Sequence, residues 1–201
     1  NTQKKILNIH GLEKGANRGQ GLGNKFLANI REVDAIIHVV RCFEDENILR
    51  EEGEINPISD KEIIDTELQL KDLDSIERKM QRIQKMATTG GDPKAKKEYE
   101  ILKSCQEHLL QGKSIRSMQL SKEEKIAIED LCLLTEKPVL YVANVDENSI
   151  HTGNRFSEAL IQAVKNDEDA MVIVLNNSIE AQIAEMPDED KELFLSEYNL
   201  T

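Results

Sequence analysis

Residues 139–147 read VLYVANVDE, an apolar run that ends in Asn144, Asp146 and Glu147. A short apolar run with little polar alternation is typical of a parallel strand that is covered on both faces. Three other runs share this character: 5–9 (KILNI), 34–43 (DAIIHVVRCF) and 170–175 (AMVIVL). Helical segments are expected at 24–33, 156–165, 179–185 and 190–197. The resulting order, β-α-β followed later by β-α-β-α, predicts an α/β domain with a parallel sheet.

The middle of the chain, residues 57–136, shows no strand pattern and interrupts this order. Ser59 and Glu62 are spaced as a capping box that begins a helix. Apolar residues then step by three and four in the narrow stripe of a coiled coil. The stripe comprises Leu73, Ile76, Met80, Ile83 and Ala87. A first long helix is therefore expected here.

A second long helix follows the turn at residues 88–91 (TTGG). Asp92 is a good N-cap, and Pro93 suits the first helical position. Heptad spacing recurs at Ala95, Leu102 and Leu109, with Cys105 near the seam. The two helices predict an antiparallel hairpin. A capping box from Ser121 to Glu124 begins a third helix that leads back to the sheet.

Composition and charge exclude several classes of protein. The 201 residues carry 26 Lys and Arg against 38 Asp and Glu, for a net charge of −12. This balance argues against DNA as a partner and against an anionic membrane surface, since both need a clustered positive field. No apolar run approaches the roughly 18 residues that span a bilayer. A hydrophobic content of 39% suits a globular chain, and an aromatic content of 3% implies an aliphatic core.

The cysteines and histidines do not suggest a metal site or a disulfide framework. Cys42, Cys105 and Cys132 lie far apart, and no C-x-x-C pair occurs. A reducing, cytoplasmic compartment is the simplest interpretation. Cys105 and Cys132 are expected to be small core residues.

Four segments together resemble the Obg-like ATPases, the YchF family of P-loop NTPases. They are 19–32 (GQGLGNKFLANIRE), 34–44 (DAIIHVVRCFE), 66–74 (TELQLKDLD) and 137–147 (KPVLYVANVDE). The resemblance implies a cytoplasmic ATPase associated with ribosomes. It also implies a G-domain core with an inserted helical coiled coil, and a C-terminal TGS domain elsewhere in the family protein.

On this resemblance the chain divides into two parts. Residues 1–56 and 137–201 are expected to form a nucleotide-binding α/β domain, incomplete at its N-terminal side, and residues 57–136 the coiled-coil insertion. The P-loop pattern G-x-x-x-x-G-K-[S/T] occurs nowhere in the 201 residues. The expected function is that of a segment of an ATP-binding and ATP-hydrolysing protein, weak or inactive by itself. The alternative is a non-enzymatic module whose hairpin binds the ribosome or a protein.

The segment Asn144-Val145-Asp146-Glu147 is the leading candidate for a nucleotide site. It follows a buried strand at the sheet edge where nucleotides bind in such folds. GTPases carry N-K-x-D here, and the carboxylate accepts two N–H groups of guanine. The longer Glu147 and the resemblance imply ATP, with GTP less favoured. Asn144 and Glu147 would frame the site, with the Val145 backbone near the base. The alternative is an Asn-Asp turn that ends the strand.

The resemblance assigns further positions near the phosphates. Gly11 matches the glycine of the family's D-x-x-G, on the γ-phosphate side. Asn8 replaces the Asp of that motif, so it is a weak candidate for binding Mg²⁺ through water. A neutral strand-end Asn is the alternative, because a hard cation prefers negative charge. Arg50 stands where many family members carry a His, and an ion pair with nearby acids is its simpler role. The 176–178 segment (NNS) replaces the S-A-x motif near the base.

Basic residues gather near the expected tip of the hairpin. They are Lys79, Arg82, Lys85, Lys94, Lys96 and Lys97. Such a cluster suits a contact with ribosomal RNA even though the whole chain is acidic. The alternative is a solvated helix face with ion pairs four residues apart.

Overall fold

The computed structural model describes residues 30–44, 55–165, 170–187, 191 and 195. The expected strand at 5–9 and most of the helices at 24–33 and 190–197 lie outside these residues. The chain forms two compact units. Among the described residues, a helical unit contains 30–36, 60–139 and 170, and a sheet unit contains 37–44, 55–59, 140–165, 171–187, 191 and 195. The domain limits at 57 and 136 stay a prediction.

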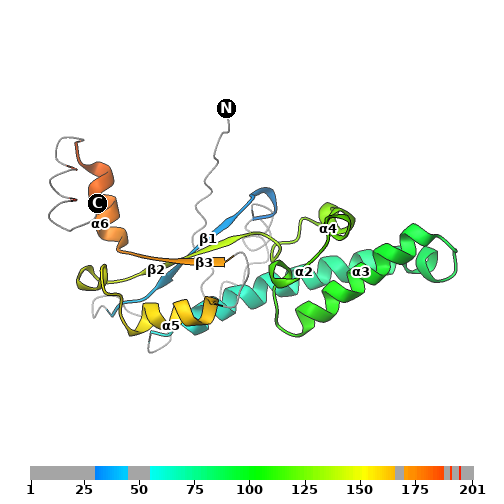
Figure 1. Ribbon diagram of the computed structural model, residues 1–201, viewed down its shortest axis with the longest axis horizontal. Helices are drawn as coiled ribbons and strands as arrows, with labels where there is room; N and C mark the ends of the chain where they lie inside the picture. The colour runs from blue at the N-terminus through cyan, green and yellow to red at the C-terminus, as the bar shows by residue number, and fades with distance from the viewer. Residues whose placement is uncertain (1–29, 45–54, 166–169, 188–190, 192–194, 196–201) are drawn as a thin grey trace, which may run out of the picture. The chain divides into compact units, whose positions relative to one another are not determined.

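The sheet has three strands, β1 (Ile36–Arg41), β2 (Val139–Asn144) and β3 (Ala170–Leu175), in the order β1-β2-β3 (Figure 1). Ile36 N donates to Pro138 O at 2.9 Å, and Cys42 N donates to Asn144 O at 2.8 Å. Both partners advance by six residues between these bonds, as parallel strands require. Helix α5 (Arg155–Val164) connects β2 to β3. The predicted parallel α/β sheet is thereby confirmed.

Burial differs between the central and outer strands. Most side chains of β2 are buried, whereas exposed and less exposed residues alternate along β1 and β3. The exposed fractions reach 62% at Ile37 and 68% at Met171. The prediction that both faces are covered is therefore wrong for the outer strands. An unbroken Val/Ile run supplies apolar side chains to both faces, but it does not determine which face acquires a packing partner.

The helical unit is built on the hairpin of α2 (Pro57–Thr88) and α3 (Pro93–Leu110), which run side by side (Figure 1). Its hydrophobic core comprises Ile76, Met80, Ile83, Ile101, Leu102, Cys105, Leu109, Ile115, Ile128 and Leu133. The predicted stripes of both helices thus supply the seam. The shorter helices η2 (Ile115–Ser117), α4 (Lys122–Ile128) and η3 (Glu129–Leu131) complete the unit. Within the described residues, no helix combines the length and apolar character needed to cross a membrane.

Side-chain caps set where the helices of the insertion begin. Asp92 accepts hydrogen bonds from Lys94 N and Ala95 N, and Ser121 forms its capping box with Glu124, as predicted. The predicted cap at Ser59 is wrong. Helix α2 begins at Pro57, and Asn56 Oδ1 accepts from Ser59 N at 3.0 Å. Asn is as strong a cap as Ser, and a Pro in the first helical position favours the earlier start.

Two buried charges lie within the helical unit. The Asp72 side chain accepts hydrogen bonds from Leu134 N at 2.8 Å, Thr135 N at 2.8 Å and Thr135 Oγ1 at 2.7 Å. Burial raises the pKa of the Asp72 carboxyl above its ordinary value, although these hydrogen bonds act in the opposite direction. The carboxylate therefore ties α2 to the segment that leads into β2.

Lys79 is the second buried charge, with 5% of its surface exposed. Its Nζ pairs with Asp130 Oδ1 at 2.6 Å and with Glu98, and it donates to Ala127 O at 3.1 Å. Lys79 thus connects α2 with α3, α4 and η3.

Cys132 does not occupy the core position predicted for it. It is exposed and lies in the left-handed region with φ of 45°, where η3 ends. Cys105 is buried as predicted, and burial raises the pKa of its thiol to about 11. Heptad spacing identified Cys105, whereas nothing comparable surrounds Cys132.

Candidate functional site

The carboxyl ends of β2 and β3 form the edge of the sheet where open α/β folds bind ligands. Strand β2 ends at Asn144, and the chain then enters the short helix η4 (Glu147–Ser149). Strand β3 ends at Leu175, and helix α6 (Asn177–Glu185) follows after Asn176. Each strand therefore passes directly into a polar turn and a helix, and the two turns lie next to one another.

Three hydrogen bonds join these turns. Val145 N donates to Leu175 O at 2.9 Å, which extends the ladder of the sheet. Asn176 Nδ2 donates to Val145 O at 2.7 Å. Asn177 N donates to Asn144 Oδ1 at 2.9 Å. Side-chain amides thus hold together two segments that are about thirty residues apart in the sequence.

After these bonds, several polar groups at the edge keep their capacity for a ligand, and two of them belong to the predicted site. Within the described residues, Asn144 Nδ2 and the Glu147 carboxylate have no hydrogen-bond partner. Asn144 is partly exposed and Glu147 is exposed. One is an N–H donor and the other is a charged acceptor. Together they offer a donor and an acceptor to a molecule bound against this edge.

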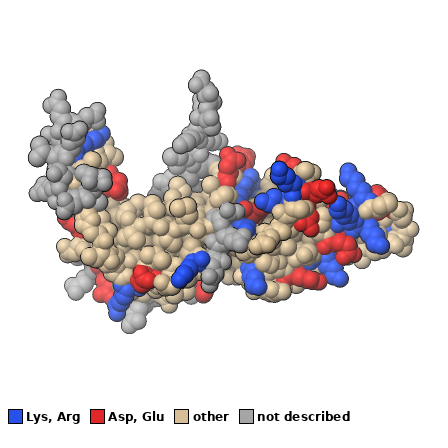
Figure 2. Space-filling view, viewed as in Figure 1, with Lys and Arg blue, Asp and Glu red and all other residues tan. Residues whose placement is uncertain are grey.

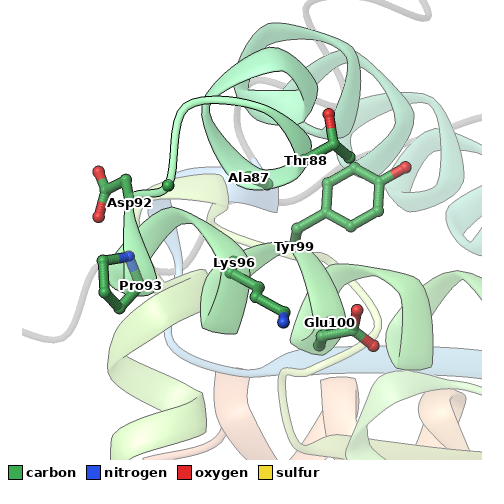
Figure 3. A pocket seen from close by; sticks show the side chains of 8 residues that line it. Ala87, Thr88, Asp92, Pro93, Lys96, Tyr99 and Glu100 are labelled. Atoms are coloured by element: carbon green, nitrogen blue, oxygen red, sulfur yellow. The ribbon is translucent and has the colours of Figure 1, made fainter.

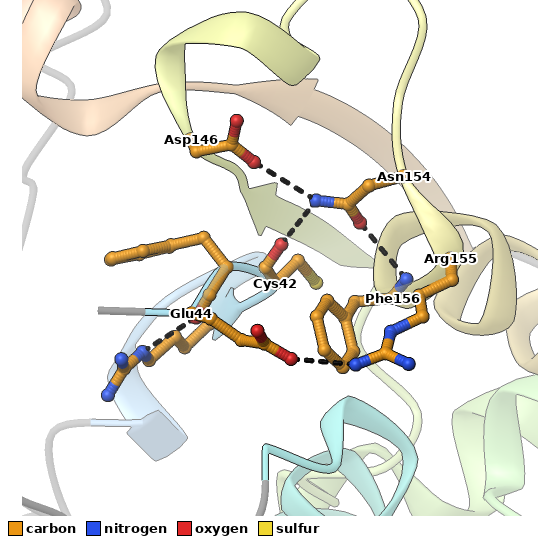
Figure 4. A network of polar contacts seen from close by, with 8 residues as sticks. Cys42, Glu44, Asp146, Asn154, Arg155 and Phe156 are labelled. Carbon is orange, nitrogen blue, oxygen red and sulfur yellow. Dashed lines mark hydrogen bonds and ion pairs between the residues drawn. The ribbon is translucent and has the colours of Figure 1, made fainter. Parts of the chain in front are cut away.

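Asn154 makes a second set of contacts at the same edge (Figure 4). Its Nδ2 donates to Cys42 O at 2.7 Å and approaches Asp146 Oδ1 at 3.4 Å. Its Oδ1 accepts from Phe156 N and Ser157 N and so caps α5. Asn154 therefore links the end of β1, the turn after β2 and the start of α5.

Asp146 makes a further contact within its own turn, and an ion pair lies nearby. Asp146 Oδ1 also accepts from Ser149 Oγ at 2.7 Å. Arg155 pairs with Glu44 at 2.7 Å, and both side chains are largely exposed (Figure 4). An exposed pair of this kind contributes little to stability. Asp146 thus shapes the turn, as the alternative of an Asn-Asp turn described.

The structure brings Asn144, Val145 and Glu147 to one place, as their sequence positions require. The Val145 side chain is buried, and both its N–H and its C=O are engaged within the chain. Gly11, Asn8 and Arg50 lie outside the described residues. Among the residues that the structure describes, no group of three His, Cys, Asp or Glu side chains is placed to hold a metal ion.

Sequence reasoning missed Asn154 and undervalued Asn176. Both are N-caps that precede an amphipathic helix, and Asn154 has Ser157 three residues later in a capping box. An N-cap is recognisable from sequence. The second use of each amide, as a donor to a distant strand end, depends on the tertiary fold.

The tip of the hairpin is a second candidate site. A hollow of about 660 Å³ lies between the end of α2 and the start of α3 (Figure 3). Its lining includes Thr88, Asp92, Lys96, Tyr99 and Glu100. The lining mixes both signs of charge with one aromatic ring, so the hollow by itself does not indicate one class of ligand.

The basic cluster at the tip is smaller than the sequence suggested. Lys79 is buried among acidic partners, so its inclusion in an exposed cluster is wrong. Lys97 pairs with Glu123 at 2.8 Å. The remaining cations, Arg82, Lys85, Lys94 and Lys96, are exposed. Figure 2 shows basic and acidic side chains mixed along the hairpin.

The chain is similar over nearly its whole length to curated proteins from bacteria and an animal. It is 45% identical over 199 residues to "Ribosome-binding ATPase YchF" of Escherichia coli O157:H7, covering 99% of this chain and 54% of that protein. It is 42% identical over 201 residues to the Bacillus subtilis (strain 168) protein of the same name, with coverage of 99% and 54%. For "Obg-like ATPase 1" of Xenopus laevis, identity is 37% over 196 residues, with coverage of 96% and 50%. The chain thus spans about half the length of these relatives.

A solved structure supports the same relationship. The Schizosaccharomyces pombe YchF GTPase matches with a TM-score of 0.81 and 31% identity, covering 95% of this chain and 52% of that one. No family model matches the chain. Similarity in sequence and in fold extends across both the sheet and the hairpin, and on these grounds the chain belongs to the Obg-like ATPase (YchF) family.

Proposed function

We propose that this chain supplies the base-binding edge and the coiled-coil insertion of a ribosome-associated ATPase. The ATPase activity and the association with ribosomes are taken from the names of the relatives. The observation that carries the assignment of the site is the pair of available groups, Asn144 Nδ2 and the Glu147 carboxylate, at an edge where hydrogen bonds from Asn176 and Asn177 hold the turns together. Ribosome association would place the protein in the cytoplasm.

The chemistry of this pair favours adenine. On one edge, adenine presents the N6 amino group as a donor and N7 as an acceptor. The Glu147 carboxylate would accept from N6, and Asn144 Nδ2 would donate to N7. Guanine presents two acceptors, O6 and N7, on that edge, so a carboxylate facing it would be repelled. ATP is therefore the proposed nucleotide, and GTP the less favoured one.

Hydrolysis needs groups that the site does not supply. Phosphoryl transfer depends on a loop that cradles the phosphates and on a cation that neutralises charge. The P-loop pattern occurs nowhere in the 201 residues. We therefore expect the 201 residues by themselves to hydrolyse ATP weakly or not at all.

Nucleotide titration tests the site. The protein expressed from its whole reading frame is titrated calorimetrically with ATP and with GTP in Mg²⁺ buffer. ATP should bind about tenfold more tightly, and Glu147→Ala should lower ATP affinity by about tenfold, as the loss of one charge-assisted hydrogen bond predicts. Asp74→Ala, which removes an exposed carboxylate on α2, is the matched control. Equal affinity for both nucleotides, or an unaffected Glu147 variant, would refute the assignment.

The hairpin is the second functional element that we propose, as the part that contacts the ribosome. Its support is the group of exposed cations at the tip together with the ribosome-binding names of the relatives. Cations gathered at one end of a rod-like hairpin can contact RNA phosphates even on an acidic chain. This contact would also serve the non-enzymatic alternative, in which the sheet acts only as a scaffold.

Co-sedimentation with ribosomes tests the hairpin. The triple variant Lys85→Glu, Lys94→Glu, Lys96→Glu should lose most of its sedimentation. The control, Lys103→Glu, Lys113→Glu, Lys122→Glu, makes the same charge change at exposed positions elsewhere in the helical unit. It should sediment as the unmodified protein does. Equal losses in both variants would assign the effect to net charge and count against a contact at the tip.

A further inference from the structure

The two polar atoms of the Asn176 side chain perform separate tasks. Its Oδ1 accepts from Ile179 N at 2.9 Å and caps α6. Its Nδ2 donates to Val145 O at 2.7 Å. The first contact is local and stabilises a helix start, whereas the second reaches across to the neighbouring strand end.

The second contact fixes the segment that carries both proposed base-binding groups. Val145 lies between Asn144 and Glu147, its side chain is fully buried, and its N–H is held by Leu175 O. Asn176 satisfies the remaining main-chain polar group of Val145. If that donor were lost, Val145 O would need water as a partner, and the peptide between Val145 and Asp146 would be free to rotate. Glu147 would then move relative to Asn144.

We propose that Asn176 is a positioning residue that sets the spacing between Asn144 Nδ2 and the Glu147 carboxylate, so that the choice of base depends on its side-chain N–H. This inference rests on the proposed function. It assigns no contact between Asn176 and the nucleotide. Asn177 directly follows Asn176, and its main-chain N–H donates to Asn144 Oδ1. This hydrogen bond fixes the side chain of Asn144, the other proposed base-binding residue.

The two tasks of Asn176 are separable by substitution. In Asn176→Asp the carboxylate still caps α6, because Asp is as good an N-cap as Asn, but it cannot donate to Val145 O. In Asn176→Ser the hydroxyl still caps the helix without adding a charge, and it is too short to reach the neighbouring strand. Gln182→Glu makes the same amide-to-carboxylate change at an exposed position on α6 and serves as the control for charge.

The test measures the ratio of ATP to GTP affinity in the protein expressed from its whole reading frame. The ratio should fall at least about fivefold in both Asn176 variants and stay unchanged in Gln182→Glu. Loss of helix stability alone would lower the affinities for both nucleotides by the same factor and leave their ratio unchanged.

A readout without nucleotide examines the contact itself. Hydrogen exchange at the amides of Val145 and Asn177 should accelerate about tenfold in both Asn176 variants and stay unchanged in Gln182→Glu. If the unmodified protein prefers ATP and both Asn176 variants keep the same ratio of ATP to GTP affinity, the positioning role alone is overturned. An unmodified protein that binds neither nucleotide, or that shows no preference, would overturn the proposed function and this inference with it.

Discussion

The helical unit and the carboxyl edge of the sheet differ in whether their polar groups find partners within the chain. In the helical unit, Asp72 and Lys79 are buried, and each makes three polar contacts within the chain. At the sheet edge, asparagine side chains hold the turns together, but Asn144 Nδ2 and Glu147 keep unused capacity. Removing a partner of a buried charge destabilises a fold, whereas exposed groups without a partner in the chain are available to a ligand. The comparison therefore assigns stability to the first region and recognition to the second.

The largest expected effect is on the core of the hairpin. Leu102 is fully buried in α3, whereas Leu110, near the end of the same helix, is 65% exposed. Leu102→Ala should lower the free energy of unfolding by about 2–5 kcal/mol, because it leaves a cavity in the seam. Leu110→Ala should change it by less than about 0.5 kcal/mol. Urea denaturation followed by circular dichroism measures both, and similar values for the two variants would contradict the packing described.

The buried carboxylate should give the next largest effect. Asp72→Asn places an amide N–H against the donors of Leu134 and Thr135, which should cost about 1–3 kcal/mol of unfolding free energy. Asp74→Asn makes the same change two residues away, where the side chain is exposed and pairs with Arg78. That control should cost less than about 0.5 kcal/mol. A stable Asp72→Asn variant would show that the contact is not needed to join α2 to the segment before β2.

A smaller effect is expected from pH at the base of the hairpin. His108 Nε2 lies 3.1 Å from Ser114 O and 2.8 Å from Ser117 Oγ, and burial lowers the pKa of the imidazole below its ordinary value. The unfolded chain therefore binds a proton more readily than the folded one. Stability from this group is present above about pH 6.5 and decreases as the pH falls through the pKa of the folded state. Denaturation of the unmodified protein and of His108→Gln between pH 5 and 8 measures the difference between their slopes. Stability should rise less with pH in the variant, and a variant whose stability rises more steeply with pH would contradict the burial.

The smallest effect on stability is expected at the sheet edge. Glu147→Ala should leave the unfolding free energy unchanged within about 0.5 kcal/mol, because its exposed carboxylate has no partner among the described residues. Reduced nucleotide affinity together with unchanged stability would sharpen the contrast between the two regions. A loss of several kcal/mol at Glu147 would instead place it among the structural charges.

Much of the fold was predictable because it depends on local patterns. Heptad spacing identified the seam residues of α2 and α3, and apolar runs located β1, β2 and β3. The resemblance of residues 137–147 to the Obg-like ATPases pointed to the sheet edge that we propose as the site. Patterns of this kind arise from the period of the helix and the strand, which sequence displays directly.

The predictions that failed depend on choices that sequence leaves open. Asn56 and Ser59 are both good caps, and the structure uses the first. Lys79 looked like one cation in an exposed group, but its neighbours Glu98 and Asp130 come from other elements. The cross-strand donors Asn154 and Asn176 were hidden for the same reason, because a side chain's distant partner is determined only by the tertiary fold.

The proposed recognition of adenine is tested most directly by NMR. Backbone amide chemical shifts are measured while ATP is added to the protein expressed from its whole reading frame. Shifts are expected at residues 144–149 and 176–179, with a weaker response to GTP. The hairpin residues around Asp92 should not respond to either nucleotide. Shifts confined to the hairpin, or equal responses to ATP and GTP at the sheet edge, would contradict the claim that Asn144 and Glu147 recognise adenine.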